Sequence, residues 1–423
     1  MPFNQEIAGL RPAPCAGPSK PAGRSPSPMK LLHVIASMNP ADGGPVEGIL
    51  KQAEVTRDEC ECEVACLDHP DDPWIEAAPL KIHALGTSAA WPALLRHWRY
   101  SPRLAPWLRE NAGGYDAVIV NGLWNYAAFG ASRALPGGPV PYYVFTHGMM
   151  DPWFRRTYPL KHAAKQVFWT VGEGRLMAGA TRVLFTTEEE RLLARGQFLD
   201  HPYRETVVGY GTSSPPSRTP QQTEAFRAAA PALGDRPFLL YLSRIHEKKG
   251  CDLLIEAFAR SKAIAPNLQL VMAGPGAPHL IESLRALAER LGISESIHWT
   301  GMITGDAKWG AFYTAEAFIL PSHQENFGVV VAESLACGLP VLISDKVNIW
   351  REVASAGAGL VQPDTLEGAT ALIHDWLGTS PEARRDMADR GKTLFQRAFD
   401  IASIGPALLE MIRRTATPRA EAG

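Results

Sequence analysis

The sequence predicts an α/β protein with two doubly wound parallel-sheet domains that face each other across a cleft. From Lys30 onward, short and nearly continuous apolar runs alternate with stretches long enough to form a helix. Such runs are typical of parallel strands that helices cover on both faces. The alternation stops at residues 211–222, GTSSPPSRTPQQ, and then starts again, which predicts a linker and a second domain of similar size.

The first domain is expected over residues 29–210, with apolar runs KLLHVIAS, CEVACL, YDAVIVN, PYYVFTHG, RVLFTT and TVVGYG. The second is expected over residues 223–395, with runs FLLYLS, LQLVMAG, IHWTG, AFILPS, PVLIS and GAGLVQ. Between them, CDLLIEAFARS and HLIESLRALAERLG repeat apolar residues at helical spacing. Residues 396–414 predict a last helix, which can pack back on the first domain.

Composition excludes several classes of function. The 423 residues are 46% hydrophobic and 20% charged, as in ordinary globular proteins, and no apolar run reaches the roughly 18 residues of a membrane span. A formal net charge of −2 argues against a nucleic-acid partner held by a bulk positive field, so an anionic ligand needs local cations. Residues 1–28 are rich in Pro, Gly, Ala and Ser without an apolar core, which predicts a disordered leader and no secretory signal.

Cysteine and glycine motifs exclude further classes. The six cysteines form no Cys-x-x-Cys pair, so we expect no metal site and a reducing compartment. GGPVEG and GPGAPH match neither the dinucleotide fingerprint nor the P-loop, which disfavours a dehydrogenase and a P-loop ATPase. Gly43 and Gly44 still lie between the first strand and its helix, where backbone amides can approach a phosphate or sugar. A simple tight turn explains them equally well.

Cations follow the first strand of the second domain. YLSRIHEKKG places Arg244, Lys248 and Lys249 between that strand and an amphipathic helix. Cationic side chains beside a helix N-terminus suit a diphosphate, although a solvated charged face is the alternative.

Two glutamates flank the apolar run of HQENFGVVVAESLACGLPVL. If both were helical, Glu325 and Glu333 would be separated by about 12 Å of rise along the axis. The carboxylates of a glycosidase pair lie roughly 5 to 10 Å apart across one sugar bond, so a hydrolase pair is not the natural interpretation. We expect them instead to bind hydroxyls at the two ends of a nucleotide sugar, with amides at 326–329 on the phosphates between.

These motifs resemble those of the retaining glycosyltransferases of family four, which have the GT-B fold of two facing Rossmann-like domains. The resemblance rests on DGGPVEG, THG, LSRIHEKKG, VMAGPG and ENFGVVVAE and covers roughly residues 30–414. It implies an acceptor-binding first domain and a nucleotide-sugar-binding second domain. The positions that it implies for donor binding are Gly43, Gly44, Arg244, Lys249, Gly274, Ile303, Glu325, Asn326, Phe327, Gly328, Val329 and Glu333.

The resemblance also implies individual roles. Arg244 and Lys249 would neutralise the diphosphate, Glu333 would hold the ribose, and Glu325 and His147 would bind the transferred sugar. The implied reaction is a hexosyl transfer with retention, in which the leaving diphosphate helps deprotonate the acceptor hydroxyl. No Asp-x-Asp motif occurs, and the cations make a metal or other cofactor unnecessary. The base of the nucleotide (UDP, GDP or ADP) stays open.

The acceptor side is less specified. THGMMDPWFRRTYPLK resembles a subset of bacterial enzymes that build polysaccharide or lipopolysaccharide, which implies a glycan or lipid-linked acceptor reached from the cytoplasm. Asp151, Trp153, Arg155 and Arg156 are candidates for the acceptor site, with surface packing as the alternative. Residues 91–110, WPALLRHWRYSPRLAPWLRE, combine tryptophan and arginine as at a membrane interface, or form a helix that covers the sheet. The alternative functions are another GT-B activity, such as an epimerase or disaccharide synthase, and a noncatalytic nucleotide-sugar-binding scaffold.

Overall fold

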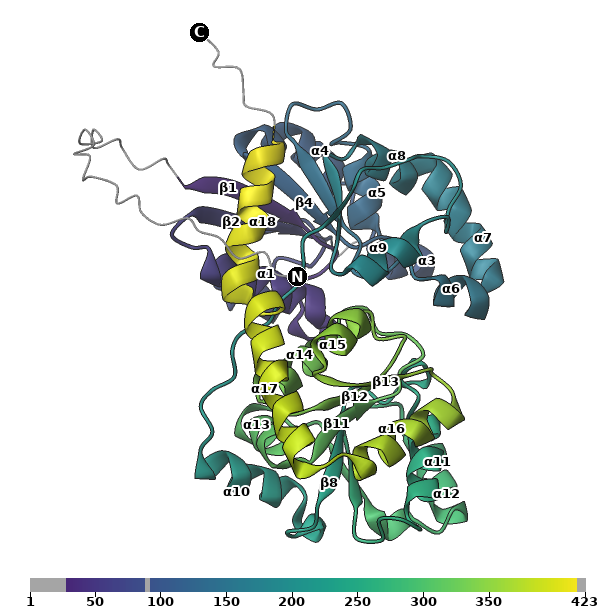
Figure 1. Ribbon diagram of the computed structural model, residues 1–423. Coiled ribbons are helices and arrows are strands. Elements are labelled where there is room, and N and C mark those ends of the chain that lie inside the picture. The colour runs from purple at the N-terminus through teal and green to yellow at the C-terminus, as the bar shows by residue number, and fades with distance from the viewer. Residues whose placement is uncertain (1–27, 88–91, 417–423) are drawn as a thin grey trace, which may run out of the picture.

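The computed structural model describes residues 28–87 and 92–416, so the expected leader at 1–28 lies outside the described residues apart from its last position. The described chain forms two parallel sheets, one of seven strands and one of six, each between layers of helices (Figure 1). The prediction of two doubly wound parallel-sheet domains is confirmed.

The first sheet has the order β3-β2-β1-β4-β5-β6-β7, and every strand pair is parallel. All five residues of its central strand Ala117–Asn121 are buried, which agrees with a sheet covered on both faces. The strands are β1 (Met29–Val34), β2 (Cys60–Cys66), β3 (Lys81–Ala84), β4 (Ala117–Asn121), β5 (Tyr142–Phe145), β6 (Arg182–Phe185) and β7 (Glu205–Val207).

The second sheet has the order β10-β9-β8-β11-β12-β13 and is also entirely parallel. Its order is that of a dinucleotide-binding sheet, although the fingerprint of such proteins is missing from the sequence. The strands are β8 (Phe238–Leu242), β9 (Gln269–Ala273), β10 (Ile297–Gly301), β11 (Ala317–Leu320), β12 (Val341–Ser344) and β13 (Gly359–Gln362).

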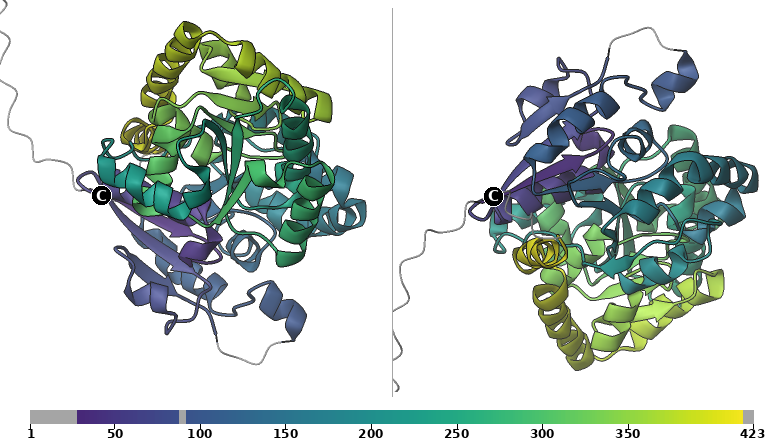
Figure 2. Two further views of the ribbon diagram at one scale, coloured as in Figure 1. Left: turned by 90° about the horizontal axis from the view of Figure 1, so that it is seen from below. Right: turned by 90° about the horizontal axis from the view of Figure 1, so that it is seen from above.

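Helices cover both faces of each sheet, as Figure 2 shows from below and from above. Those of the first domain are α1 (Gly44–Val55), α2 (Pro73–Glu76), α3 (Ala93–His97), α4 (Leu104–Asn111), α5 (Tyr126–Ser132), α6 (Pro152–Thr157), α7 (Pro159–Phe168), a π-helical turn (Trp169–Glu173), α8 (Gly174–Gly179) and α9 (Glu188–Ala194). Those of the second are α10 (Pro220–Ala229), α11 (Cys251–Ser261), α12 (Pro278–Arg290), α13 (Gly305–Thr314), α14 (Val329–Ala336), α15 (Trp350–Ala356), α16 (Leu366–Gly378) and α17 (Pro381–Ala398), followed by α18 (Ile401–Thr415).

Two chain segments join the domains. The connection after β7 is extended until α10, which begins at Pro220, inside the stretch expected as a linker. A capping box between Thr219 and Gln222 starts this helix. The second connection is α18, which crosses back to the first domain and lies against its sheet and α1 (Figure 1). Its Leu408, Leu409 and Ile412 are buried there in an apolar cluster.

Metal and membrane features can be judged for the described residues. In these ranges, no group of three or more His, Cys, Asp and Glu side chains is arranged to hold a metal ion. The cysteines described as free are Cys60, Cys62, Cys66, Cys251 and Cys337. No helix within 28–87 and 92–416 has both the length and the apolar character needed to cross a membrane.

Candidate functional site

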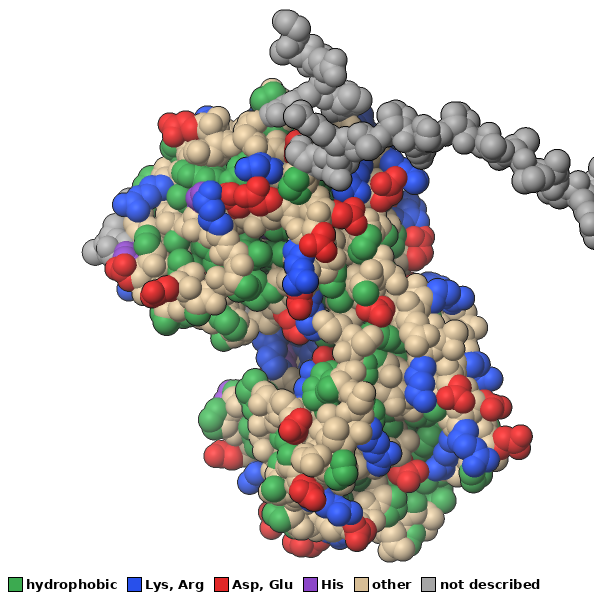
Figure 3. All heavy atoms as spheres, turned by 90° about the vertical axis from the view of Figure 1, so that its left-hand side faces the viewer, with side chains coloured by type: hydrophobic (Ala, Val, Ile, Leu, Met, Phe, Trp, Pro, Cys, Tyr) green, Lys and Arg blue, Asp and Glu red, His purple; other side chains and the backbone are tan. Residues whose placement is uncertain are grey.

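In both sheets, loops that follow the carboxyl ends of the strands point toward the gap between the domains. In each sheet the strand order reverses beside the first strand, since β1 lies between β2 and β4 and β8 lies between β9 and β11. Loops that follow parallel strands at such a point form the binding crevice of open α/β sheets. Here the loops after β1, β5, β8 and β11 line an interdomain cavity of about 470 Å³. Figure 3 shows the cleft as a hollow with Lys and Arg side chains inside it.

The cavity brings most of the predicted donor and catalytic residues together. From the predicted set it is lined by Gly44, His147, Arg244, Lys249, Glu325, Asn326, Phe327, Gly328 and Val329. Four predicted residues do not line it. Gly43 precedes α1 with φ +82°, and Ile303 is buried in the core of the second domain. A Cβ at Gly274 would lie 1.9 Å from the Ser243 carbonyl oxygen, so this glycine allows two strand ends to approach closely. The fourth is Glu333.

Among the described residues, three cations and one carboxylate make up the charged lining of the cavity. Lys249 is buried and forms an ion pair with Glu325, whereas Arg244 is exposed to the cleft. Lys248 donates a hydrogen bond to the Gln324 side-chain oxygen at 3.3 Å, and burial together with the charge of Lys249 lowers its pKa. The lining residues therefore carry two net positive charges.

A tight loop holds Glu325 at the start of α14. Its backbone amide donates to the Lys346 carbonyl at 3.0 Å, and its carbonyl accepts from the Asn348 amide at 3.0 Å. Gly328 then adopts a left-handed conformation with φ +72° and begins the helix. The first amides of an α-helix have no acceptor within the helix, and since the Val331 amide already donates to the Gly328 carbonyl at 2.8 Å, those of Val329 and Val330 are available to an anion in the cavity.

Glu333 lies in the same helix but faces a different neighbour. Its Oε1 accepts from Lys308 of α13 at 2.7 Å. Its Oε2 is buried and has no hydrogen-bond partner in the described chain, and burial raises the pKa of this carboxyl. Lys51 of α1 in the other domain acts on it electrostatically, so Glu333 lies near the domain boundary. A buried acceptor without a donor is costly unless a ligand supplies one.

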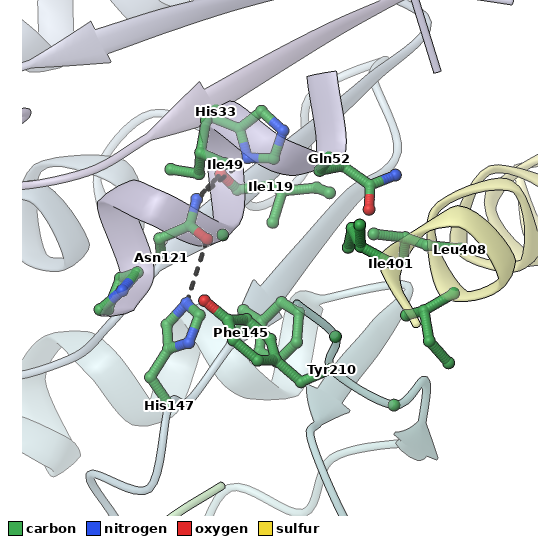
Figure 4. Close-up of a pocket in the computed structure, with 15 residues that line it drawn as sticks. His33, Ile49, Gln52, Ile119, Asn121, Phe145, His147, Tyr210, Ile401 and Leu408 are labelled. Atoms are coloured by element: carbon green, nitrogen blue, oxygen red, sulfur yellow. Dashed lines mark hydrogen bonds between the residues drawn. The ribbon is translucent and has the colours of Figure 1, made fainter. Parts of the chain in front are cut away.

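His147 follows β5 with a left-handed φ of +48° and lies at the end of a polar chain (Figure 4). Its Nε2 lies 3.2 Å from Oδ1 of Asn121, and Nδ2 of Asn121 lies 3.3 Å from Nδ1 of His33. An amide oxygen only accepts, so Nε2 of His147 carries the proton. Burial and the neighbouring His33 lower the pKa of His147 to about 3. His147 is therefore neutral at physiological pH and is a weak base.

Glu190 of α9 fixes the loop that carries His147. Its carboxylate is only 4% exposed and accepts hydrogen bonds from two loops of the first domain. The donors are Thr146 Oγ1 and the Gly148 amide, each at 2.6 Å, and the amide and hydroxyl of Thr186, at 2.7 and 2.6 Å. Thr186 Oγ1 in turn accepts from Asn326 of the second domain at 3.2 Å. This carboxylate therefore links two loops of the cavity wall to the facing domain.

The candidate acceptor residues lie on and beside α6, and none of the four lines the cavity. Asp151 caps this helix by accepting from the Trp153 amide at 2.8 Å, and burial raises its pKa. Trp153 is half-buried, whereas Arg155 and Arg156 are exposed in the last turn. Phe154, which was not predicted, lines the cavity instead. The role of Asp151, Trp153, Arg155 and Arg156 in acceptor binding stays a prediction.

Sequence reasoning also missed Tyr210, a residue between β7 and the linker. Its hydroxyl donates to the Gly44 carbonyl at 2.5 Å, and its ring packs edge-on against Phe327 at 5.3 Å. A Cβ at Gly48 would lie 2.0 Å from the same hydroxyl, so a glycine is needed there. The run TVVGYG marked only a strand end, and no local pattern shows that Tyr210 reaches both α1 and the second domain.

A buried carboxylate supports the wall near α6. Glu173 ends the π-helical turn and accepts from the Trp124 amide at 2.6 Å, while its other oxygen has no partner in the described residues. Trp124 has φ +66°, and its indole N–H donates to the carbonyl of Met149, which lines the cavity. Burial raises the pKa of Glu173 to about 8.

This raised pKa predicts a loss of stability as pH rises. In the unfolded chain Glu173 ionises near 4.5, so its contribution is full below that pH and is lost as pH approaches about 8. As pH rises from 5 to 7, the wild type should lose unfolding free energy that Glu173→Gln retains. We therefore expect the difference in unfolding free energy, variant minus wild type, to increase by about 2 to 3 kcal/mol over this range. Urea unfolding of both proteins at each pH measures it.

The difference between Glu173→Gln and wild type is free of the pH-dependent stability contribution of His147, which has the opposite sign. Because the pKa of His147 is lowered from 6.5 to about 3, that contribution is full above 6.5 and is lost as pH falls. It is common to both proteins and cancels in their difference. A difference that stays constant from pH 5 to 7 would contradict a buried, protonated Glu173.

Comparisons with known proteins match both halves of the chain. Residues 43–211 match the model of the Glycosyl transferase 4-like domain, and residues 222–394 match that of Glycosyl transferases group 1. A D-inositol 3-phosphate glycosyltransferase of Geodermatophilus obscurus is 33% identical over 240 residues, which are 54% of this chain and 51% of that protein. The chain spans about half the length of the curated relatives it matches.

Solved structures agree with the fold. Anabaena HepE, in complex with UDP and glucose, has a TM-score of 0.71 at 16% identity and covers 91% of this chain and 99% of its own. WaaG, a glycosyltransferase involved in lipopolysaccharide biosynthesis, has a TM-score of 0.64 at 18% identity with the same coverages. These neighbours have the two-domain GT-B arrangement that the sequence motifs implied.

Proposed function

Because the chain belongs to the GT4-type glycosyltransferases, with a group 1 glycosyl transferase domain in its second half, we propose that it transfers a sugar from a nucleotide sugar to a hydroxyl acceptor. The observation that carries this proposal is the charge of the interdomain cavity. Arg244, Lys248 and Lys249 face a single carboxylate, Glu325, beside the N-terminus of α14. Two net positive charges complement the two negative charges of a sugar-linked nucleoside diphosphate.

The donor fits the cavity in one direction. The diphosphate lies between Arg244, Lys249 and the first amides of α14, and the transferred sugar lies toward Glu325 and His147. Its ribose lies toward Glu333, whose unpartnered Oε2 can accept from a ribose hydroxyl. UDP is the first nucleotide to test, since the neighbour HepE was solved with UDP and with UDP-glucose. GDP and ADP are the alternatives.

The charged groups favour transfer with retention and without a metal. The bond from the anomeric carbon to the diphosphate oxygen breaks, the bond to the acceptor oxygen forms on the same face, and the acceptor proton passes to the leaving phosphate. Among the residues that line the cavity, Glu325 is held by Lys249, and neutral His147 is a weak base. The phosphate is therefore the available base. Fixed cations stabilise the leaving charge, so the proposed reaction needs no metal.

The acceptor is proposed to be a glycan or lipid-linked intermediate of bacterial surface polysaccharide, modified from the cytoplasm. The fold similarity to WaaG supports this acceptor class. A small phosphorylated polyol is the second candidate, because several relatives are named D-inositol 3-phosphate glycosyltransferase. Transfer assays with inositol phosphate and with lipid-linked oligosaccharide distinguish the two.

Nucleotide binding tests the donor site. We expect UDP to raise the melting temperature of the wild type equally with magnesium and with chelator, since bound ligand stabilises the folded state. Arg244→Ala should weaken UDP binding about tenfold through loss of a charged hydrogen-bond donor. Thermal-shift titration with UDP, GDP and ADP measures both effects.

The control for that titration is Arg260→Ala, which removes an exposed arginine of α11 outside the cavity and should leave binding unchanged. If no nucleotide stabilises the wild type at millimolar concentration, or if Arg244→Ala binds as the wild type does, the proposed diphosphate site is wrong.

A further inference from the structure

Helix α7 has its apolar side facing outward. None of its ten residues is buried, yet Leu160, Ala163, Ala164, Val167 and Phe168 recur at helical spacing on the exposed side. Leu160 is 87% exposed and Val167 is 63% exposed. Surface helices of globular proteins normally turn such a stripe toward the core. An exposed stripe of this kind marks a surface that binds an apolar partner.

Most of the charges around this stripe are positive; the exposed Asp200 lies near its C-terminal end, because the neighbouring Leu199 bonds to Gln166 of α7. Arg155, Arg156, Lys161 and Arg175 are exposed, and the sequence contains no Asp or Glu between residues 152 and 172. The next acidic residue, Glu173, is buried. An apolar stripe bordered by an excess of cations is the composition of a helix that lies in the interface of an anionic membrane.

The stripe also lies close to the cavity and to the segment in which the sequence predicted membrane contact. Phe154 of α6 lines the cavity, and a single residue, Tyr158, separates α6 from α7. Figure 1 shows α6 and α7 at the edge of the first domain opposite α18. Trp98, from the predicted 91–110 segment, is half-buried and packs against Phe168 at 5.5 Å. Arg96 and His97, which precede Trp98 in the chain, are exposed.

The geometry points to α6–α7 as a peripheral docking surface for an anionic lipid bilayer. Leu160, Val167 and Phe168 enter the boundary of the acyl chains, and the cations contact the headgroup phosphates. A second copy of the chain is disfavoured as the occupant, because a two-fold interface would place these cations against one another. This inference rests on the proposed function, because docking of α6–α7 would hold the cavity beside the bilayer in which a lipid-linked acceptor resides.

Vesicle flotation tests the surface without requiring activity. We expect the wild type to float with phosphatidylcholine vesicles only when they contain phosphatidylglycerol, and less at high salt. The double variant Leu160→Ser/Val167→Ser should reduce vesicle binding about tenfold, since two apolar side chains no longer enter the membrane. The matched control is Ile264→Ser, which changes a 61% exposed apolar residue of the second domain and should float as the wild type does.

The outcomes separate this inference from the proposed function. UDP-induced stabilisation should be the same in wild type, double variant and control, which shows that the donor site is intact. Failure of the wild type to float with anionic vesicles overturns the docking surface, and so does normal flotation of the double variant. The docking surface is also overturned if size-exclusion chromatography with light scattering shows the wild type as a dimer and the double variant as a monomer. Absence of nucleotide binding with normal flotation overturns only the proposed function.

Discussion

Glu325→Gln is expected to abolish sugar transfer while nucleotide binding is retained. The substitution keeps the size of the side chain but removes the one carboxylate that lines the cavity in the part of the chain that the structure describes. The sugar then loses a charged acceptor for its hydroxyls and a negative group beside the oxocarbenium-like transition state, so kcat should fall about 10³-fold. Lys249 loses the carboxylate with which it pairs, so UDP should bind at least as tightly as to the wild type. Transfer kinetics and UDP titration on one preparation measure the split.

A surface carboxylate provides the matched control. Glu316→Gln removes one partner of an exposed ion pair with Arg384, away from the cavity, and should leave both measurements unchanged. Retention of kcat within tenfold in Glu325→Gln would contradict the role of this carboxylate. If the wild type binds UDP but turns over no nucleotide sugar with any acceptor, the noncatalytic scaffold is the better explanation.

Most of the fold could be predicted because most elements have their own local signal. Buried parallel strands require nearly continuous apolar runs, and these runs marked every strand except β3, an edge strand whose residues are exposed or half-buried and which was missed. The start of α10 was missed although Thr219, Pro220 and Gln222 form a recognisable capping pattern. The Pro-rich composition around them was interpreted as linker, while the proline in fact occupies the first turn of the helix.

In the candidate site, too, residues within a local motif could be predicted, and residues placed by distant packing could not. Residues such as Arg244, Lys249 and Glu325 follow strands within short motifs, so their meeting at one sheet edge followed from the chain order. Glu333 was expected in the donor site; it is not among the residues that line the cavity and its Oε1 pairs with Lys308, so its role in holding the ribose stays a prediction. Such pairing depends on how α13 packs beside α14. Asn121, Tyr210 and Glu190 escaped prediction for the same reason, since each acts through partners distant in sequence.

Glu190 illustrates what the packing adds, and removing it should have the largest effect on stability. Glu190→Ala removes the acceptor of four buried donors of Thr146, Gly148 and Thr186, of which the Thr146 hydroxyl keeps a long contact to the Leu184 carbonyl at 3.4 Å. Each such donor costs about 1 to 3 kcal/mol, and partial relaxation reduces the total, so we expect a loss of about 4 kcal/mol in unfolding free energy. Urea unfolding measures it.

The neighbouring residue supplies the control for Glu190. Glu189 forms an interdomain ion pair with the half-exposed Arg351 at 2.5 Å, so Glu189→Ala should cost about 1 kcal/mol or less. Glu190→Gln retains one oxygen but points an amide N–H₂ at two donors, so it should recover only part of the lost stability. Recovery to the wild-type value would contradict the need for a carboxylate, because a single acceptor oxygen would then suffice. The same contacts hold the loop of His147, so kcat should fall with stability in both Glu190 variants and not in Glu189→Ala.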